Sequence, residues 1–484
     1  MKPNILFINV DQMRADCMSA IGHPVVETPY LDQLARHGVL FNNAYSATPT
    51  CVPARASILT GMNQTNHGRV GYEDEVPWNY EHTLPGELAD AGYHTQCVGK
   101  MHVYPTRNLC GYHNVVLHDG YMHYNRDKRT PSGRSFSEVD DYLRWLKEKA
   151  GVTKDMLDLG LDCNSSVTAR PWELPEEYHP TNWVVNESID FLRRRDPSKP
   201  FFLKMSFVRP HPPFDPPKFF YDQYINEDLP EPAIGDWVLE DGLQESGLDP
   251  LTQNGMVPKK RLNRARAAYY ALISHIDNQI GRFLLALNEY GELENTVILF
   301  ASDHGEMLGD HHRFAKALPY EGSTKVPFIV SEFGQTMGLD KGSTVDDVVE
   351  LQDIMPTLLD AADVSIPDTV DGRSVLPLAR GESIGWRGYI HGEHARGAES
   401  HQFLTNGREK YIWYSQTGEE QYFDLSKDPK EKLNLAGALA YSETVDMWRA
   451  RLVDELTGRE EGYTDGEKLI VGRAPKTVLG HLRE

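Results

Sequence analysis

Two acidic side chains in this sequence stand directly after apolar, β-branched runs. Asp11 follows residues 5–10, and Asp303, with His304 beside it, follows residues 296–301. Such runs are typical of buried strands in a parallel sheet, and the carboxyl ends of parallel strands meet at the sheet edge where ligands bind. A hard divalent cation prefers several oxygen ligands from separate segments. The pattern therefore favours a metal site, although either Asp alone would equally serve as a cap of the following turn.

Cys51 opens a second segment with chemical potential. Pro53 suits the first turn of a helix, so Cys51 is expected at the helix start, with Arg55 one turn onward. A helix N-terminus stabilises negative charge, and a guanidinium group offers fixed donors to an anion. The alternative for a free cysteine is a buried structural role, which we expect for Cys17, Cys97, Cys110 and Cys163.

The segment that begins at Cys51 resembles the complete sulfatase signature: Cys51-x-Pro53-x-Arg55, followed by Leu59-Thr60-Gly61. Sulfatases belong to the alkaline phosphatase superfamily, and in their formylglycine-dependent (type I) members a separate generating enzyme oxidises this cysteine to formylglycine. The aldehyde hydrates to a diol, one oxygen attacks sulfur, and the other is deprotonated to expel sulfate. The resemblance implies a sulfuric ester hydrolase, close to bacterial arylsulfatases, that acts on a small-molecule or saccharide sulfate ester.

Further catalytic residues follow from the same resemblance. The segment Gly99-Lys100-Met101-His102 is similar to the family's GKxH, which implies a sulfate-binding Lys100 and a proton-accepting His102. Two residues apart on an extended segment share a face, and imidazole transfers protons near neutral pH. His211 looks like the histidine that assists the leaving oxygen, and Lys316 matches a second sulfate-binding lysine. Together with Arg55, the two lysines are expected to bind the sulfate group, although a lone lysine is more often solvated and a histidine between prolines more often structural.

For the metal, the resemblance implies Asp11, Asp303, His304 and an oxygen of modified Cys51, most commonly around Ca²⁺. Gln12 stands where the common pattern has a second Asp, and His304 where many members have Asn. A neutral amide and an imidazole soften the site and make Mn²⁺ or Mg²⁺ more credible. The same combination also resembles phosphonate monoester hydrolases and choline sulfatases. A phosphonate monoester or phosphodiester hydrolase with the same nucleophile is therefore the alternative, and a silent binding protein the more distant one.

The elements that must position these residues alternate along the chain. Apolar runs predict strands at residues 5–10, 94–98, 201–208, 296–301 and 327–331, and amphipathic patterns predict helices at 28–37, 84–91 and 264–288. This order predicts an α/β catalytic domain over residues 1–375, with a mostly parallel central sheet flanked by helices, as in alkaline phosphatase. The polar stretches 119–179 and 224–260 are expected to be loops over the sheet edge.

The C-terminal part changes character. Short runs at residues 387–392, 401–405, 410–414 and 418–425, with a helix at 443–456, predict a small α+β domain over residues 376–484, built on a short antiparallel sheet. The tail, residues 465–484, is either an oligomerisation arm, which would make the protein a homo-oligomer, or an arm packed on its own subunit. Tyr104, Arg107 and His113 are candidates for the substrate pocket wall, with surface-loop positions equally compatible.

Composition limits the partners. The 484 residues include 49 Lys and Arg against 71 Asp and Glu, a formal net charge of −22. This charge disfavours nucleic acid or an anionic membrane as a partner, so an anionic substrate needs a local cationic pocket. Five cysteines without a CxxC indicate neither a disulfide framework nor a zinc module. The first residues indicate a strand rather than a signal peptide, so we expect a cytoplasmic protein, or a periplasmic or secreted one if a leader has been removed.

Overall fold

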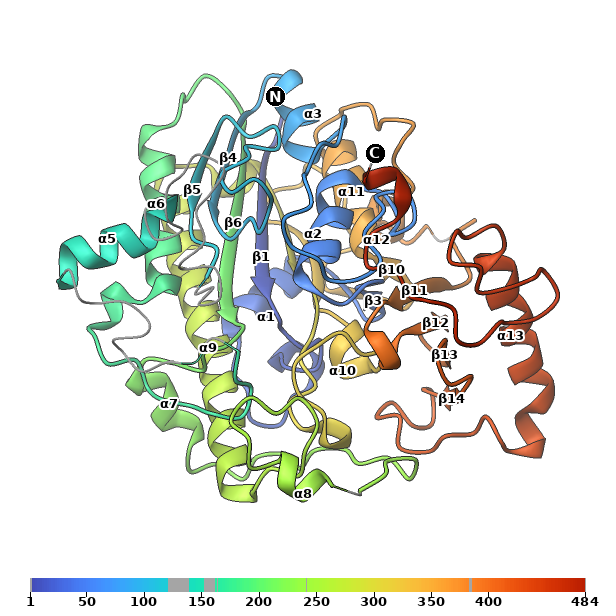
Figure 1. Cartoon of the computed structure of the whole chain (residues 1–484). Helices are drawn as coiled ribbons and strands as arrows, with labels where there is room; N and C mark the ends of the chain where they lie inside the picture. The colour runs from blue at the N-terminus through green and yellow to red at the C-terminus, as the bar shows by residue number, and fades with distance from the viewer. Residues whose placement is uncertain are drawn as a thin grey trace.

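The computed structural model describes residues 2–120, 139–151, 162, 164–240, 242–382 and 385–483. Its largest element is an eight-stranded sheet in the order β5-β4-β6-β1-β7-β8-β2-β9 (Figure 1). The strands, in that order, are Asn114–Leu117, His94–Gly99, Phe201–Pro210, Asn4–Asp11, Thr296–Ser302, Phe328–Glu332, Gly38–Phe41 and Ser343–Val345. From β5 to β7 all neighbours are parallel. The predicted mostly parallel α/β sheet is therefore confirmed.

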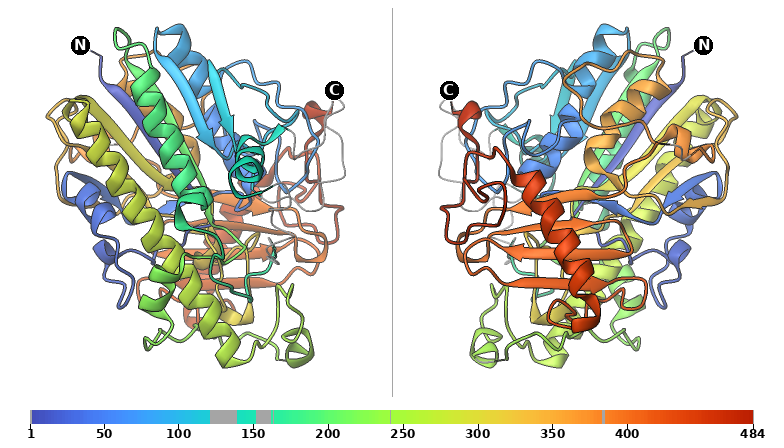
Figure 2. Two further views of the ribbon diagram at one scale, coloured as in Figure 1. Left: turned by 90° about the vertical axis from the view of Figure 1, so that its left-hand side faces the viewer. Right: turned by 90° about the vertical axis from the view of Figure 1, so that its right-hand side faces the viewer.

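Two helical layers cover this sheet. In β1, Leu6, Ile8 and Val10 face one apolar core with α1, α5, α6, α7 and α9, whereas Ile5 and Phe7 face a second core with α2, α3, α11 and α12. This alternation follows from the two-residue period of a strand, and burial of both faces explains the continuous apolar run. The view in Figure 2 places the long helix α9 along one side of the sheet.

The α-helices have the following bounds: α1 Pro29–Arg36, α2 Cys51–Thr60, α3 Leu84–Asp90, α5 Asp141–Ala150, α6 Pro180–Arg194, α7 Lys218–Tyr224, α8 Leu243–Ser246, α9 Lys259–Glu289, α10 Glu321–Thr324, α11 Ile354–Ala361, α12 Leu376–Ala379 and α13 Ser442–Leu456. Asp277 of α9 accepts hydrogen bonds from the backbone N–H groups of Tyr30 and Leu31 in the first turn of α1, at 3.1 and 2.7 Å. Burial raises the pKa of Asp277 to about 7. This carboxyl group therefore joins two helices of one layer.

A second, four-stranded antiparallel sheet is formed by β11 (Ile390–His394), β12 (His401–Thr405), β13 (Glu409–Tyr414) and β14 (Glu420–Asp424). Helix α13 packs against it through Trp448 and Leu452 (Figure 2). The predicted C-terminal α+β unit on a short antiparallel sheet is confirmed. In the tail, Val478 pairs with Arg69, and the N–H of Leu479 donates to the Gly68 carbonyl at 2.8 Å, so the tail lies on its own chain.

Several local expectations were incomplete. Strand β8 runs antiparallel to its neighbours β7 and β2. Helix α5 interrupts the polar stretch expected to be a loop, and α6, β2 and β5 had not been predicted. Two very short strands, β3 (Ala44–Tyr45) and β10 (Val349–Glu350), form a separate pair. Among the described helices, none combines the length and apolarity needed to cross a bilayer.

Candidate active site

Four adjacent parallel strands each deliver one polar side chain to the same edge of the large sheet. Asp11 ends β1, while Lys100, His211 and Asp303 directly follow β4, β6 and β7. Asp11 and Asp303 are completely buried, and Lys100 is nearly so. The expected convergence of Asp11 and Asp303 at the carboxyl edge is thus observed, and it extends to two cationic or titratable residues.

Cys51 is the first residue of α2 and is 2% exposed. Its Sγ atom lies 3.2 Å from Lys316 Nζ, 3.2 Å from His304 Nε2, 3.8 Å from Asp11 Oδ1 and 3.9 Å from Lys100 Nζ. Burial and Asp11 oppose ionisation, but Lys100, Lys316 and His304 outweigh them and hold the pKa of the Cys51 thiol well below its usual value. The Sγ atom marks the place of the side-chain oxygen in a converted residue, so this position is one where the protein stabilises negative charge.

Arg55 lies one turn along α2, and its guanidinium is fully engaged. Nε donates to Asp303 Oδ2 at 3.0 Å, Nη2 lies 2.9 Å from the same oxygen and 3.2 Å from Asp11 Oδ2, and Nη1 donates to Lys100 O and Ser206 Oγ at 3.0 and 3.1 Å. The guanidinium group thus makes four hydrogen bonds and, between Nη2 and Asp303 Oδ2, a further ion pair. Arg55 therefore clamps the two carboxylates, and its expected contact with the sulfate group stays a prediction.

A group of metal-ligand atoms lies around Cys51. One atom each from Asp11, Cys51, Asp303 and His304 falls within 4.8 Å of the others. His304 Nδ1 is 3.0 Å from the Gly305 carbonyl, to which it donates, so the Nε2 lone pair faces the cluster, as it does in metal-ligating histidines. Burial and the neighbouring Asp11 raise the pKa of Asp303. A cation between the two carboxylates would relieve that repulsion, and the donor set fits a divalent metal.

Gln12 lies at the border of this cluster. Its Oε1 accepts a hydrogen bond from Lys316 Nζ at 2.7 Å, and its Nε2 donates to Glu306. The backbone of Gln12 has φ of 70°, with its N–H donating to Asp303 Oδ1 at 3.1 Å. The side-chain carbonyl thus faces Lys316, which also contacts Cys51, while the role of Gln12 as a metal ligand stays a prediction.

A cavity of about 430 Å³ opens above Cys51. Its floor includes Lys100, His211 and Lys316, and apolar walls are formed by Tyr72, Val208, Pro212, Ala315 and Ala317. His394 and Arg396, from the end of β11 and the turn after it, complete one side. The small sheet therefore contributes directly to the wall of the cavity.

Two histidines border the cavity with different partners. His102 Nε2 lies 3.4 Å from Asp74 Oδ1, and the backbone N–H of His102 donates to Asp119 Oδ1 at 2.8 Å. Burial opposes protonation of His102, but Asp74 and Cys51 raise its pKa above the usual value. His211 Nδ1 donates to the Pro212 carbonyl at 2.8 Å, and burial followed by Lys316 holds the pKa of His211 well below its usual value. These surroundings keep the His211 imidazole neutral.

The sequence left open whether three residues belong to the pocket wall or to surface loops. Tyr104, Arg107 and His113 are not among the described residues that line the cavity. Arg107 instead forms an ion pair with Asp141 at 3.0 Å, and His113 forms a hydrogen bond with Thr95. Cys17 and Cys97 are buried as expected, Cys110 is half-buried, and Cys163 lies outside the described residues.

The sequence interpretation missed the cavity residues His394 and Arg396 and the supporting residues Asp74 and Glu306. Glu306 carried a signal, since it lies two residues beyond His304 in the same strand-end segment. Asp74, His394 and Arg396 carried none, because only the folded chain brings them to the catalytic edge.

Comparisons with known proteins agree with this geometry. The family model described as Sulfatase matches residues 3–364, and that of the N-sulphoglucosamine sulphohydrolase C-terminal region matches residues 309–457. The chain is 58% identical over 483 residues to an arylsulfatase of Clostridium perfringens (strain 13 / Type A), with 100% of both chains covered. It is 30% identical to the multifunctional alkaline phosphatase superfamily protein PehA of Trinickia caryophylli, covering 92% of this chain and 93% of that one.

Among solved structures, the phosphonate monoester hydrolase of Agrobacterium radiobacter matches with a TM-score of 0.74 and 26% identity, over 94% of this chain and 95% of that chain. The matched fold, the signature at Cys51 and the identities together define the class: the chain belongs to the sulfatase family. It is a sulfuric ester hydrolase with the alkaline-phosphatase-like fold predicted from the sequence. Family membership implies conversion of Cys51 to formylglycine and a bound metal ion, for which the cluster around Cys51 is suited.

Proposed function

We propose that the chain hydrolyses an aryl sulfate monoester in the cavity above Cys51, after a formylglycine-generating enzyme has converted that residue. The observation that carries this proposal is the position of Cys51 Sγ beside Lys316 and Lys100, at the floor of a cavity with apolar walls. A cationic floor suits a sulfate group, and apolar walls suit an aromatic ring. Converted Cys51 supplies the hydrated aldehyde whose oxygen attacks sulfur.

In this proposal, Lys100 and Lys316 bind the sulfate oxygens and stabilise the charge that develops on them. Their Nζ atoms lie 3.9 and 3.2 Å from Cys51 Sγ, close enough to contact a tetrahedral group held there. Arg55 acts behind them by holding Asp11 and Asp303 in place. This local cluster of cations explains how a chain of net charge −22 accepts an anion.

The two histidines divide the proton transfers. His102, supported by Asp74 at 3.4 Å, takes the proton from the nucleophilic residue when sulfate is expelled. His211 presents Nε2 to the cavity, because Nδ1 donates to Pro212 O, and it assists departure of the alcohol oxygen. A neutral His211 with its proton on Nδ1 has none to give at Nε2. A bound sulfate ester adds negative charge near Lys316, which raises the His211 pKa so that Nε2 can carry the proton that the leaving alcohol oxygen takes.

In this proposal, one divalent cation would be held by Asp11, Gln12, Asp303, His304 and the side chain at position 51. Ca²⁺ is our first choice, and Mn²⁺ or Mg²⁺ the alternatives, because an imidazole and a neutral amide stand among the oxygen ligands. A bound cation supplies positive charge that polarises the sulfate and favours the ionised nucleophile. Elemental analysis of protein purified without added metal would identify the ion.

We further propose that the chain divides into a catalytic domain, residues 1–375, and a C-terminal domain, residues 376–484. The C-terminal domain would add His394 and Arg396 to the substrate wall. The tail, residues 465–484, lies on its own chain around Gly68 and Arg69, so a dimer arm would have to use its outer face.

Hydrolysis of a phosphonate monoester or phosphodiester is the second candidate function. It is favoured by the presence of both Gln12, next to Asp11, and His304, next to Asp303. The test compares kcat/KM for an aryl sulfate and for the matching aryl phosphonate monoester in the converted protein. We expect the larger value for the sulfate, and loss of both activities in Cys51→Ala. A larger value for the phosphonate would assign the second function, and turnover that survives in Cys51→Ala would contradict both.

A further inference from the structure

Glu306 is a completely buried carboxylate for which the proposed reaction has no direct use. Its two oxygens accept from four donors. Oε1 accepts from the N–H groups of Leu308 and Ala315, at 2.9 and 2.5 Å, and Oε2 accepts from Ser166 Oγ at 2.9 Å and from Gln12 Nε2. Three of these contacts would organise the loop alone, but the fourth reaches Gln12, whose own N–H donates to Asp303 of the metal cluster.

The contact with Glu306 decides which end of the Gln12 amide faces the nucleophile. A carboxylate accepts hydrogen bonds, so the NH₂ end of Gln12 must point to Glu306 and Oε1 must point away. At the other end, Oε1 accepts from Lys316 Nζ at 2.7 Å. The reversed amide would set oxygen against a carboxylate and NH₂ against an ammonium group. Glu306 and Lys316 therefore specify the same orientation from opposite ends.

The backbone leaves Gln12 no other freedom. Its N–H donates to Asp303 Oδ1 at 3.1 Å, and its carbonyl accepts from the Tyr269 hydroxyl at 2.6 Å. These contacts hold the residue at a φ of 70°, in the left-handed region that side chains rarely adopt. With the backbone fixed on both sides, the side-chain amide is the part whose direction Glu306 can set.

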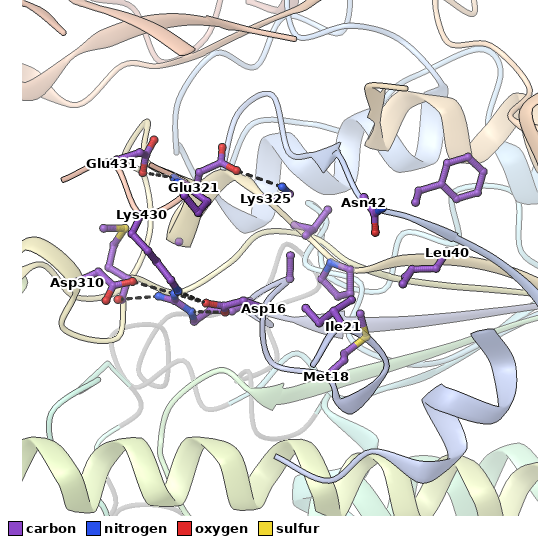
Figure 3. A pocket seen from close by; sticks show the side chains of 18 of the residues that line it. Asp16, Met18, Ile21, Leu40, Asn42, Asp310, Glu321, Lys325, Lys430 and Glu431 are labelled. Atoms are coloured by element: carbon purple, nitrogen blue, oxygen red, sulfur yellow. Dashed lines mark hydrogen bonds and ion pairs between the residues drawn. The ribbon is translucent and has the colours of Figure 1, made fainter. Parts of the chain in front are cut away.

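The loop that carries Glu306 is itself held from its far side. Arg14 donates to the Glu306 carbonyl at 3.0 Å, and it pairs with Asp16 and Asp310 at 2.7 and 2.8 Å. Lys430, from the C-terminal part of the chain, pairs with Asp16 at 2.9 Å. Figure 3 shows these ion pairs around Asp16 and Asp310, at one end of a cavity of about 330 Å³. The network fixes Glu306 without touching the catalytic cavity.

We propose that Glu306 is a positioning residue for the metal centre, which holds Gln12 so that Oε1, and not the NH₂ group, is offered to the cation. This inference rests on the proposed metal site and goes beyond it. It also accounts for the neutral residue at position 12, because the negative charge is carried by Glu306, which lies behind Gln12 and contacts its side-chain NH₂ group. Residues behind metal ligands typically change metal affinity by about 10- to 100-fold when they are replaced.

The test measures Kd for Ca²⁺ and for Mn²⁺ by calorimetry on metal-free, full-length protein. We expect Glu306→Gln to weaken binding by about 10- to 100-fold, because the new NH₂ group opposes that of Gln12 and forces the amide to reverse. In a Gln12→Ala background, the same substitution should cost less than about threefold, because Glu306 acts through Gln12. An equal loss in both backgrounds would mean a through-space charge effect and would overturn the proposal.

A reciprocal swap provides the rescue. In the double variant Q12E/E306Q, the amide now at position 306 keeps its oxygen for Leu308 and Ala315 and donates to position 12, while a carboxylate oxygen faces the cation. We expect its Kd to return to the wild-type value or below, at unchanged net charge. Failure of rescue in a variant that unfolds at the wild-type temperature would overturn the proposal.

Glu332→Gln is the matched control. Glu332 is another buried acid, at the end of β8, and it pairs with Val297 near the start of β7, so it lies at the opposite edge of the sheet from Asp303. Its substitution should leave Kd unchanged. A wild-type protein that binds neither cation would contradict the metal site and the inference together, whereas wild-type binding that Glu306→Gln leaves intact would contradict the role of Glu306 alone.

Discussion

Replacement of Arg55 by lysine tests whether this residue clamps the carboxylates or meets the substrate. The guanidinium group contacts four acceptor oxygens, and lysine offers only three N–H donors, so at least one of these acceptors loses its partner. These acceptors include Asp11 and Asp303, both completely buried. A buried acceptor left without its hydrogen bond costs about 1–3 kcal/mol. The free energy of unfolding should therefore fall by at least about 1–3 kcal/mol.

The assay is urea unfolding of the metal-free protein, together with a calorimetric Kd for Ca²⁺. We expect Arg55→Lys to lower stability and weaken Ca²⁺ binding in the same sample, because both carboxylates lose their fixed geometry. Arg69→Lys is the control: Arg69 is also buried, but it donates to neutral oxygens of Tyr80, Val76 and Pro77. That variant should lose stability and keep its Ca²⁺ affinity.

The clamp would be refuted by an Arg55→Lys protein that unfolds like the wild type and binds Ca²⁺ equally well, but has a raised KM. Such a result would mean that the guanidinium leaves the carboxylates and contacts sulfate in the substrate complex. Urea unfolding and the Kd for Ca²⁺, both measured without substrate, therefore distinguish an Arg55 that holds the carboxylates from one that contacts sulfate.

Three more outcomes are expected. Cys51→Ser should lower kcat by at least about 10⁴-fold, since serine lacks the second hydroxyl that expels sulfate from the covalent intermediate. Peptide mass should show formylglycine in active wild-type protein, and an unmodified thiol in active protein would refute the mechanism. His211→Asn should lower kcat/KM by about 10²- to 10⁴-fold, most for aryl sulfates with poor leaving groups; equal losses across a leaving-group series would argue against proton donation. The raised pKa of Asp277, about 7, means that the folded state keeps a proton that the unfolded state releases from about pH 4 upward, so wild-type stability should fall between about pH 4 and 7. In Asp277→Asn that fall should shrink by about 2–4 kcal/mol in urea unfolding at pH 4 and pH 8, and an unchanged pH dependence would contradict the buried-proton explanation.

The parts of the fold that sequence patterns predict are those with one dominant signal. Strands β1 and β7 are buried on both faces, so their apolar runs were plain, and the acidic residues after them marked the catalytic edge. Helix α5 lies in a stretch rich in charged residues, which concealed its apolar side, Tyr142, Leu143 and Leu146. Its burial depends on neighbours that are remote in sequence.

The candidate site divides in the same way. The membership of Arg55 in the site followed from its spacing to Cys51, but its partners did not, because contacts with Asp303 and Ser206 arise only when three strands and α2 assemble. His394 and Arg396 belong to a turn of the second sheet and had no local mark of function. The spacing of residues in the sequence thus predicts which residues belong to the site, whereas the partner that each hydrogen-bond donor contacts can be known only from the assembled fold.

Because the small sheet supplies part of the cavity wall, the residues that would cleave the ester and those that would select its alcohol belong to different parts of the chain. Most of the groups that would break the ester stand on or just after strand ends and on α2, with Lys316 on the long segment after β7, while Arg396 stands on a partly exposed turn after β11. Substitutions at that turn can alter which alcohol fits without displacing a single group that acts on sulfur. A lineage built on this chain can therefore acquire new substrates through its C-terminal turns and inherit its chemistry unchanged.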